Sequence, residues 1–175
     1  MSVFALAPIP LLIHFGKELG NKLQADLYQK HRSPDDWNWR QLGNDEFEFE
    51  LIKQPKVHGE KTDNVVLILS LSGKIHVKEI KNILGENFDI YEMSIPNPNP
   101  LFLQALEQLE LFSKEIRKLF GRIREHHGEN CIIHLFPAIP VPMAIEIGRS
   151  ILPKADPDIK VYDKTEEGFK YRLTV

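Results

Sequence analysis

A segment near the N-terminus of this chain recurs near its C-terminus. After Phe4-Ala-Leu-Ala-Pro-Ile-Pro10 come five residues and then Gly16, and after Phe136-Pro-Ala-Ile-Pro-Val-Pro142 come five residues and then Gly148. Matched positions differ by a constant 132 (136 − 4 = 148 − 16 = 132). Such self-similarity predicts a duplicated unit. Two copies of one binding face can close on one ligand, best one that is itself built from repeated parts.

Composition limits the classes of protein that the chain can belong to. With 175 residues, 42% of them hydrophobic, it can build a full core as one domain or two intimate halves. Its longest apolar stretches, 4–13 and 65–71, are shorter than the roughly 18 residues of a membrane span, and no secretory signal is visible. A single cysteine fits a reducing cytoplasm. The net charge of −3 disfavours a surface that coats nucleic acid, so we expect no direct DNA binding.

Strand-like and helix-like segments alternate along the chain. The continuous apolar run 65–71 is typical of a central parallel strand, and 101–127 shows a long apolar helix face after a proline-rich break. These patterns predict an α/β fold with antiparallel strands at its edges. We expect strands at 2–8, 24–30, 46–52, 65–71, 88–95, 131–136, 159–164 and 169–175, and helices at 10–19, 75–84, 101–127 and 141–152.

Three strand-to-helix turns are candidate ligand sites, because ligands of open α/β sheets bind at the carboxyl ends of strands, near helix N-termini. The turn 70–74, Ser-Leu-Ser-Gly-Lys, offers hydroxyls, a glycine and a cation, which suit a phosphate. It could equally be an ordinary helix cap. The turns 7–10 and 137–142 carry prolines, which lack the N–H that phosphate prefers and so suit the flat face of a base. Alternatively, each proline only starts a helix.

The first copy is 12 residues longer than the second between its tyrosine and the following phenylalanine (47 − 28 = 19 against 169 − 162 = 7). This insertion holds Trp37 and Trp39, beside His31 and Arg32. Aromatic and cationic groups together suit stacking on a nucleobase and pairing with phosphate. The alternative is that the tryptophans plug an open end of the core.

No catalytic or metal-binding pattern is evident. Cys131 and His134 are three residues apart on an expected strand, so their side chains point to opposite faces and cannot share an ion. No Gly-x-Ser-x-Gly motif occurs, and the paired carboxylates lie in polar loops. The sequence therefore predicts neither catalytic residues nor a metal or cofactor.

Three stretches resemble the SAVED domain: Phe4 to Gly16, Tyr28 to Arg32 with Trp37 and Trp39, and His134 to Arg149 with Val161 to Asp163. The resemblance covers essentially the whole chain. It implies two fused CARF-like, Rossmann-like halves, about 1–96 and 97–175, related by pseudo-two-fold duplication. Ligand-binding residues are then expected at Ala7, Pro8, Ile9, Pro10, His31, Arg32, Trp37, Trp39, Ser70, Leu71, Ser72, Gly73, Lys74, Phe136, Pro137, Ala138, Ile139, Pro140, Tyr162 and Lys164.

The resemblance also implies a function. SAVED domains bind cyclic oligonucleotide second messengers, made by a CD-NTase-like nucleotidyltransferase in bacterial CBASS anti-phage defence or by type III CRISPR complexes. We therefore expect a cytoplasmic receptor for a cyclic di- or trinucleotide that forms a homo-oligomer on ligand binding. It would activate an effector, for which we expect an HNH-type DNA endonuclease fused upstream. We accordingly interpret the chain as a trimmed sensor domain rather than a standalone subunit.

Two other functions stay open. The domain could be a ring nuclease that cleaves the ring it binds, with His31, Lys74 or Lys164 assisting attack by a ribose 2′-OH. It could also be an assembly module whose duplicated face meets another protein.

Overall fold

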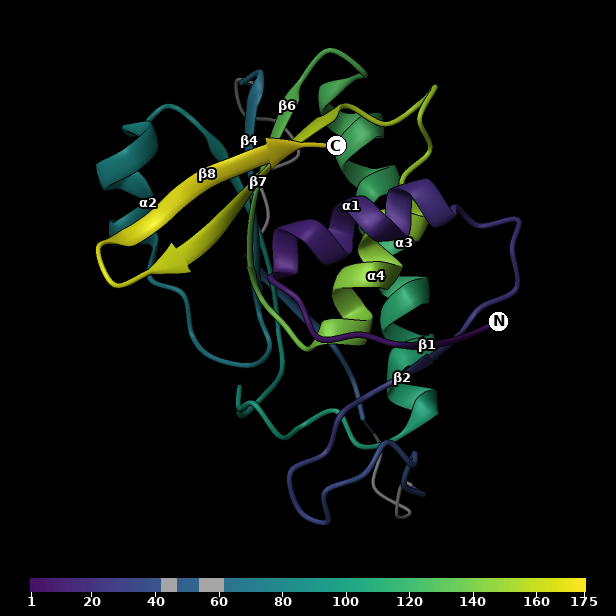
Figure 1. The fold of residues 1–175 in the computed structure, drawn as a ribbon. Helices are drawn as coiled ribbons and strands as arrows, with labels where there is room; N and C mark the ends of the chain where they lie inside the picture. The colour runs from purple at the N-terminus through teal and green to yellow at the C-terminus, as the bar shows by residue number, and fades with distance from the viewer. Residues whose placement is uncertain (42–46, 54–61) are drawn as a thin grey trace.

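A six-stranded sheet forms the centre of the computed structural model, which describes residues 1–41, 47–53 and 62–175. The four inner strands are parallel, and an antiparallel strand closes each edge, as expected for this α/β fold (Figure 1). In spatial order the strands are β3 (Glu50–Lys53), β5 (Asp89–Ser94), β4 (Asn64–Ser70), β6 (Ile132–Ala138), β7 (Asp158–Thr165) and β8 (Gly168–Thr174).

Helices cover both faces of the sheet. The short α2 (Val77–Leu84) lies on one face, and α3 (Leu106–His127) and α4 (Val141–Ser150) lie on the other (Figure 1). Outside α4 packs α1 (Ile9–Leu19), which joins the strands of a separate parallel pair, β1 (Ser2–Phe4) and β2 (Asp26–Tyr28). No described helix is both long and apolar enough to cross a membrane.

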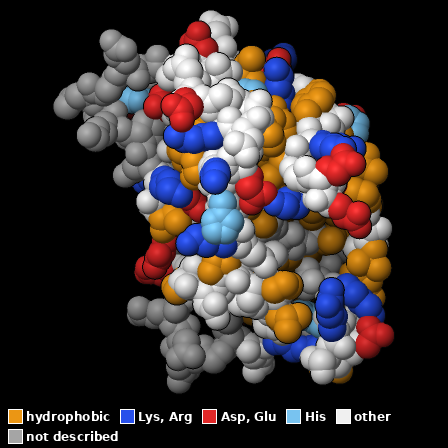
Figure 2. All heavy atoms as spheres, turned by 90° about the vertical axis from the view of Figure 1, so that its left-hand side faces the viewer, with side chains coloured by type: hydrophobic (Ala, Val, Ile, Leu, Met, Phe, Trp, Pro, Cys, Tyr) orange, Lys and Arg blue, Asp and Glu red, His pale blue; other side chains and the backbone are white. Residues whose placement is uncertain are grey.

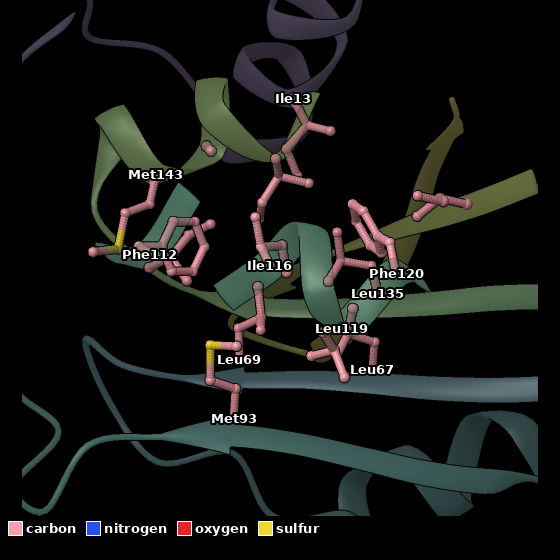
Figure 3. Close-up of a cluster of buried hydrophobic side chains, with 14 of the residues drawn as sticks. Ile13, Leu67, Leu69, Met93, Phe112, Ile116, Leu119, Phe120, Leu135 and Met143 are labelled. Atoms are coloured by element: carbon pink, nitrogen blue, oxygen red, sulfur yellow. The ribbon is translucent and has the colours of Figure 1, made fainter. Parts of the chain in front are cut away.

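The main core lies between the sheet and α3. Phe112, Ile116, Leu119 and Phe120 recur at helical spacing on one face of α3 and are buried. Figure 3 shows this row packed between side chains of the sheet, on one side, and side chains of α1 and α4, on the other. The sheet side is labelled there by Leu67, Leu69, Met93 and Leu135, and the helix side by Ile13 and Met143.

The repeated glycines explain how α1 and α4 approach so closely. A Cβ atom on Gly16 would lie 2.1 Å from the carbonyl oxygen of Ile145, and one on Gly148 would lie 2.0 Å from that of Ile13. The two contacts are related by the same offset as the repeat (148 − 16 = 145 − 13 = 132). Each glycine therefore permits direct backbone packing at the matched position of its helix.

Several element boundaries differ from the sequence-based expectation. The first strand ends at Phe4 rather than at residue 8. The strand expected at 46–52 is seen as β3, which begins at Glu50; residue 46 lies outside the described residues. The long helix begins at Leu106 rather than 101. There the Gln108 side-chain oxygen accepts the backbone N–H groups of Gln104 and Ala105, at 2.8 and 3.0 Å, which caps the helix at Ala105.

Candidate functional site

The sheet has a topological switch point between β4 and β6. The chain leaves β4 toward α2 on one face and leaves β6 toward α4 on the other. Past the strand ends, the carbonyl of Ala138 accepts the backbone N–H groups of Leu71 and Ser72, at 3.0 and 2.7 Å. The carboxyl ends of strands at such a point form the usual ligand crevice of an α/β sheet.

A groove of about 490 Å³ lies beside this edge. Val141, one of its lining residues, begins α4 just after β6. The 100–104 loop forms another part of the lining. The Asn99 N–H, which donates to the Leu71 carbonyl at 3.0 Å, holds this loop at the end of β4. Its volume lies in the range of small-molecule sites. The lining residues are Leu6, Gln29, Lys30, His31, Arg32, Ser33, Pro100, Leu101, Leu103, Gln104 and Val141.

Two of the expected ligand residues, His31 and Arg32, line this groove directly. The two proline turns adjoin it, because Leu6 precedes Ala7 and Val141 follows Pro140. Ala7 and Pro8 are exposed, whereas Pro10 and Pro140 are buried and start their helices. None of Ala7 to Pro10 or Pro137 to Pro140 lines the groove, so a ligand role for the two proline turns stays a prediction.

His31 is the most enclosed polar side chain of the groove, with 5% of its surface exposed. Its backbone N–H donates to the carbonyl of Asp36 at 2.8 Å, and its ring lies edge-on to Trp39 at 6.3 Å. Burial lowers the pKa of His31, the nearby Arg40 lowers it further, and Asp36 partly offsets both. The imidazole is therefore neutral at pH 7.

An ion pair holds the loop that follows His31. Arg40 donates two hydrogen bonds to the Asp36 carboxylate, at 2.9 and 3.2 Å, and these bonds are the main reason that the pKa of Asp36 is lowered. The Arg40 backbone N–H also donates to the carbonyl of Gln104 at 2.8 Å. This bond joins the 29–41 and 100–104 segments that form opposite walls of the groove.

The two tryptophans have different surroundings. Trp39 donates its indole N–H to the Leu27 carbonyl at 3.1 Å and packs against the main core, which fits the expectation of a plug. Trp37 lies edge-on to Phe4 at 5.3 Å and beneath the Lys30 ammonium at 5.6 Å. Of the two, Trp37 therefore has the surroundings that suit stacking on a base, with an aromatic ring and a cation beside it.

The Ser70–Lys74 turn is arranged differently from the phosphate cradle that its sequence suggests. The Ser70 hydroxyl donates to Glu92 at 2.9 Å and accepts the Ile75 N–H at 3.2 Å. The helix expected near 75–84 is present as α2, but it begins at Val77, with His76 as its N-cap. Because α2 begins only at Val77, the exposed Lys74 does not lie at a helix N-terminus, and its role as a phosphate contact stays a prediction.

Phe136, Ala138, Tyr162 and Lys164 lie on the face of the sheet that α2 covers, whereas Ile139 is buried in the main core on the other face. Phe136 is fully buried and stacks on Tyr162, with ring centroids 4.4 Å apart, so neither ring presents a surface to a ligand. Lys164 pairs with Glu79 of α2 and lies over the Phe169 ring at 4.8 Å. Figure 2 shows basic and acidic side chains interspersed over this face, without a single-sign patch. The sheet separates these residues from the groove.

Sequence reasoning missed most of the groove, including Leu6, Gln29, Lys30 and Leu101. The one available signal was the repeated Tyr-x-Lys segment, in which Gln29 stands between Tyr28 and Lys30. A second hollow of about 620 Å³ lies between β2 and α3, and Trp39 is the one predicted residue that lines it. The groove is the stronger candidate because His31 and Arg32 line it and because Val141, at the start of α4, places it next to the end of β6.

The described residues contain no cluster of three or more His, Cys, Asp or Glu side chains that could hold a metal ion. Cys131 is buried, and burial is the main cause that raises the pKa of its thiol to about 11. The thiol is accordingly protonated at neutral pH and a poor nucleophile.

Comparison with known proteins identifies the fold. The family model described as "SMODS-associated and fused to various effectors sensor domain" (SAVED) matches residues 1–175. Two structures of the Acinetobacter baumannii Cap4 SAVED/CARF-domain containing receptor are similar, one with the cyclic trinucleotide 2′3′3′-cAAA (TM-score 0.68) and one with 3′3′3′-cAAA (TM-score 0.67), each at 14% identity. The same receptor without a named ligand gives a TM-score of 0.65, also at 14% identity.

The aligned region covers 95% of this chain in the two cAAA structures and 99% in the third. It covers 36%, 36% and 35% of those receptor chains, so the chain spans about a third of their length. No curated protein gave a significant sequence match.

Proposed function

Because this chain belongs to the SAVED family of sensor domains, we propose that it is a receptor for a cyclic oligonucleotide, a cyclic di- or trinucleotide, with the groove as its binding site. The observation that carries the proposal is that cationic, apolar and buried polar side chains line one groove, which adjoins the start of α4 after β6. The similar fold of the Cap4 receptor, described with two cyclic trinucleotides, supports it.

In this proposal different side chains of the groove bind different parts of the ligand. Arg32 and Lys30 pair with phosphates of the ring, since a guanidinium and an ammonium make charge-assisted hydrogen bonds to phosphate oxygens. The apolar side chains of Leu6 and Leu101 contact the faces of bases. Trp37 adds a further stacking surface at the edge of the same segment.

The wider role follows from the family. We propose that the domain acts in CBASS-type anti-phage defence, on a ring supplied by a CD-NTase-like nucleotidyltransferase, and that two CARF-like halves, about 1–96 and 97–175, arose by duplication. Ligand binding then drives self-association and activates an effector in the full-length protein, for which an HNH-type endonuclease is our choice. The domain itself performs no chemistry. The matched glycine contacts of α1 and α4 support the duplication.

Isothermal titration calorimetry with 3′3′3′-cyclic tri-AMP tests the binding proposal. We expect saturable binding that linear tri-AMP does not match, and a roughly tenfold or greater loss of affinity in Arg32→Ala. Arg172→Ala is the matched control, because Arg172 is exposed on β8 and does not line the groove. Equal affinity in both arginine variants would move the site elsewhere.

Sedimentation velocity with and without 3′3′3′-cyclic tri-AMP tests self-association separately. We expect the sedimentation coefficient to rise at saturating ring, because a ligand shared by two protomers stabilises their contact. An unchanged coefficient at saturation would remove self-association from the proposal for this domain and leave binding intact.

A ring nuclease is the second candidate, and the neutral His31 in the groove favours it. A neutral imidazole can accept the proton of a ribose 2′-OH, which then attacks the adjacent phosphate and expels the 5′-oxygen. Anion-exchange chromatography of 3′3′3′-cyclic tri-AMP incubated with the protein distinguishes the two. A linear product ending in 2′,3′-cyclic phosphate, absent with His31→Gln, would establish the nuclease.

A further inference from the structure

Two buried polar atoms of the groove have no hydrogen-bond partner. Across residues 1–41, 47–53 and 62–175, the only buried side-chain nitrogen or oxygen atoms in this state are the Gln29 side-chain oxygen and His31 Nε2. Both residues line the groove. Native proteins rarely leave a buried polar atom unpaired, and where they do the group calls for an explanation. Since both residues belong to one wall of the groove, we consider one ligand as the partner of both atoms.

The orientation of the Gln29 carboxamide determines what it can bind. Its NH₂ group donates to the Lys30 carbonyl at 2.9 Å. A carbonyl only accepts, so the NH₂ group must face it, and the side-chain oxygen Oε1 is left as the unpaired atom. The ligand group that completes Gln29 is therefore a hydrogen-bond donor.

His31 offers the complementary group. Burial is the main cause that lowers the pKa of His31, which favours the neutral ring at pH 7. Our inference takes the tautomer with the proton on Nε2, in which this unpaired nitrogen donates. The ring is fixed by its edge-on contact with Trp39 and by the backbone bond of His31 to Asp36. Gln29 and His31 thus present an acceptor and a donor from neighbouring positions of one segment.

The ligand class follows from this pair and rests on the proposed function. We propose that Gln29 accepts a hydrogen bond from the exocyclic amino group of a nucleobase while His31 donates to the adjacent ring nitrogen. Adenine and cytosine carry that arrangement of donor and acceptor on their pairing edges. In the same pose uracil places its O4 against the Gln29 oxygen, acceptor against acceptor. The groove therefore selects cyclic oligonucleotides that contain adenine or cytosine over those that contain only uracil.

The first test uses three rings on the unaltered protein: 3′3′3′-cyclic tri-AMP, 3′3′3′-cyclic tri-UMP, and the cyclic trimer of purine riboside, which is tri-AMP without its amino groups. We expect tri-AMP to bind about tenfold or more tighter than either, because each of the other rings leaves the Gln29 oxygen unpaired. Equal affinity of tri-AMP and the purine trimer would overturn the inference.

The second test asks whether Gln29 causes the preference for tri-AMP. Gln29→Met keeps the length of the side chain and removes the acceptor, so it should weaken tri-AMP about tenfold and abolish the preference for tri-AMP over the purine trimer. Gln41→Met is the control, because Gln41 is exposed and outside the groove, and it should keep the preference of the parent. A preference retained in Gln29→Met would overturn the assignment.

These outcomes are separable from failure of the proposed function. If none of the three rings binds the unaltered protein, the receptor proposal fails and the inference about Gln29 fails with it. If tri-AMP binds but discrimination does not depend on Gln29, the receptor proposal stands and only the base-reading role is lost. Thermal melting of each variant without ligand checks that both substitutions leave the fold intact.

Discussion

The two copies of the repeated motif build the same aromatic stack in opposite environments. In the first copy Phe4 stacks on Tyr28 with centroids 4.4 Å apart and ring planes 10° apart. In the second, Phe136 stacks on Tyr162 at 4.4 Å and 15°. Phe4 is 56% exposed, whereas Phe136 is fully buried beneath α2 and β8. Local sequence thus sets the local geometry, and the surrounding elements decide whether the stack supports the fold or faces solvent.

The lysines that follow the two tyrosines repeat the contrast. Lys30 pairs with Asp35 and lies over Trp37, and Lys164 pairs with Glu79 and lies over a phenylalanine. Only Lys30 lines the groove. The Phe136–Tyr162 stack therefore belongs to the central sheet, whereas the Phe4–Tyr28 stack lies on the separate β1–β2 pair, and the segment after β2 supplies side chains to the candidate site.

Truncating the two matched phenylalanines should give the largest difference between the copies. Phe136→Ala leaves a cavity in a fully buried cluster and should destabilise the protein by about 3 to 5 kcal/mol. Phe4→Ala removes a ring that is more than half exposed and should cost about 1 kcal/mol. Urea unfolding of both variants measures the difference. Equal losses of unfolding free energy would mean that Phe4 is as well buried in solution as Phe136.

The matched glycines should instead respond alike. Gly16→Ala and Gly148→Ala each push a Cβ atom against a backbone carbonyl that cannot rotate away, so each should cost about 3 kcal/mol or more. Gly121→Ala in α3 is the control. A Cβ there meets nothing within 4 Å, so the substitution should stabilise the helix by about 0.5 to 1 kcal/mol. Thermal melts of the three variants decide whether both copies use the same contact.

Acid should destabilise the second copy through His134, for which the first copy has Ser2 at the matched position (134 − 132 = 2). Burial, aided by Lys160, lowers the pKa of His134 to about 4 from 6.5. The unfolded chain then binds the proton more readily, so stability is complete above pH 6.5 and falls as the pH drops toward 4. The loss amounts to about 3 kcal/mol.

Urea unfolding at pH 7 and pH 4.5 measures this loss. His134→Gln removes the titrating group and can still bond the Tyr162 hydroxyl, which His134 Nδ1 contacts at 2.9 Å, so the variant should lose less stability on acidification than the parent. His14→Gln, at an exposed position on α1, should behave like the parent. The same acid sensitivity in all three proteins would assign the effect to other groups.

Periodicity and the repeat predicted the fold well because they report burial along single elements. The apolar run at 65–71 appears as β4, and the prolines and glycine of the second motif appear as α4. The groove could not be predicted in this way. Its walls, 29–33 and 100–104, have no regular structure and are positioned by contacts distant in sequence, such as the Arg40 N–H to Gln104 bond.

The stacked pair at Phe136 shows a second limit of sequence reasoning. The motif predicted matching ligand residues in both copies, yet a repeated motif carries no information on which copy the rest of the chain will cover. In the second copy, Tyr162 and Phe136 are covered by side chains of α2 and β8. The residues that a ligand can reach are therefore set by tertiary packing.

Substitution of Lys30 and Lys164, which follow the two matched tyrosines, tests which of the two copies contacts the ligand. Lys30→Ala should weaken binding of 3′3′3′-cyclic tri-AMP by roughly tenfold at low salt, because it removes an ammonium group from the groove wall. Lys164→Ala should leave the affinity unchanged, since Lys164 lies on the other face of the sheet and pairs with Glu79.

Lys74→Ala is the informative third variant in the same calorimetry. A loss comparable to that of Lys30→Ala would mean that the ring extends from the groove to the Ser70–Lys74 turn, and unchanged affinity would confine the phosphates to the groove. Raising the salt concentration should shrink a genuine lysine effect, because screening weakens an exposed charge pair. If Lys164→Ala instead causes the largest loss, the ligand binds the α2 face and the distinction between the two copies is wrong.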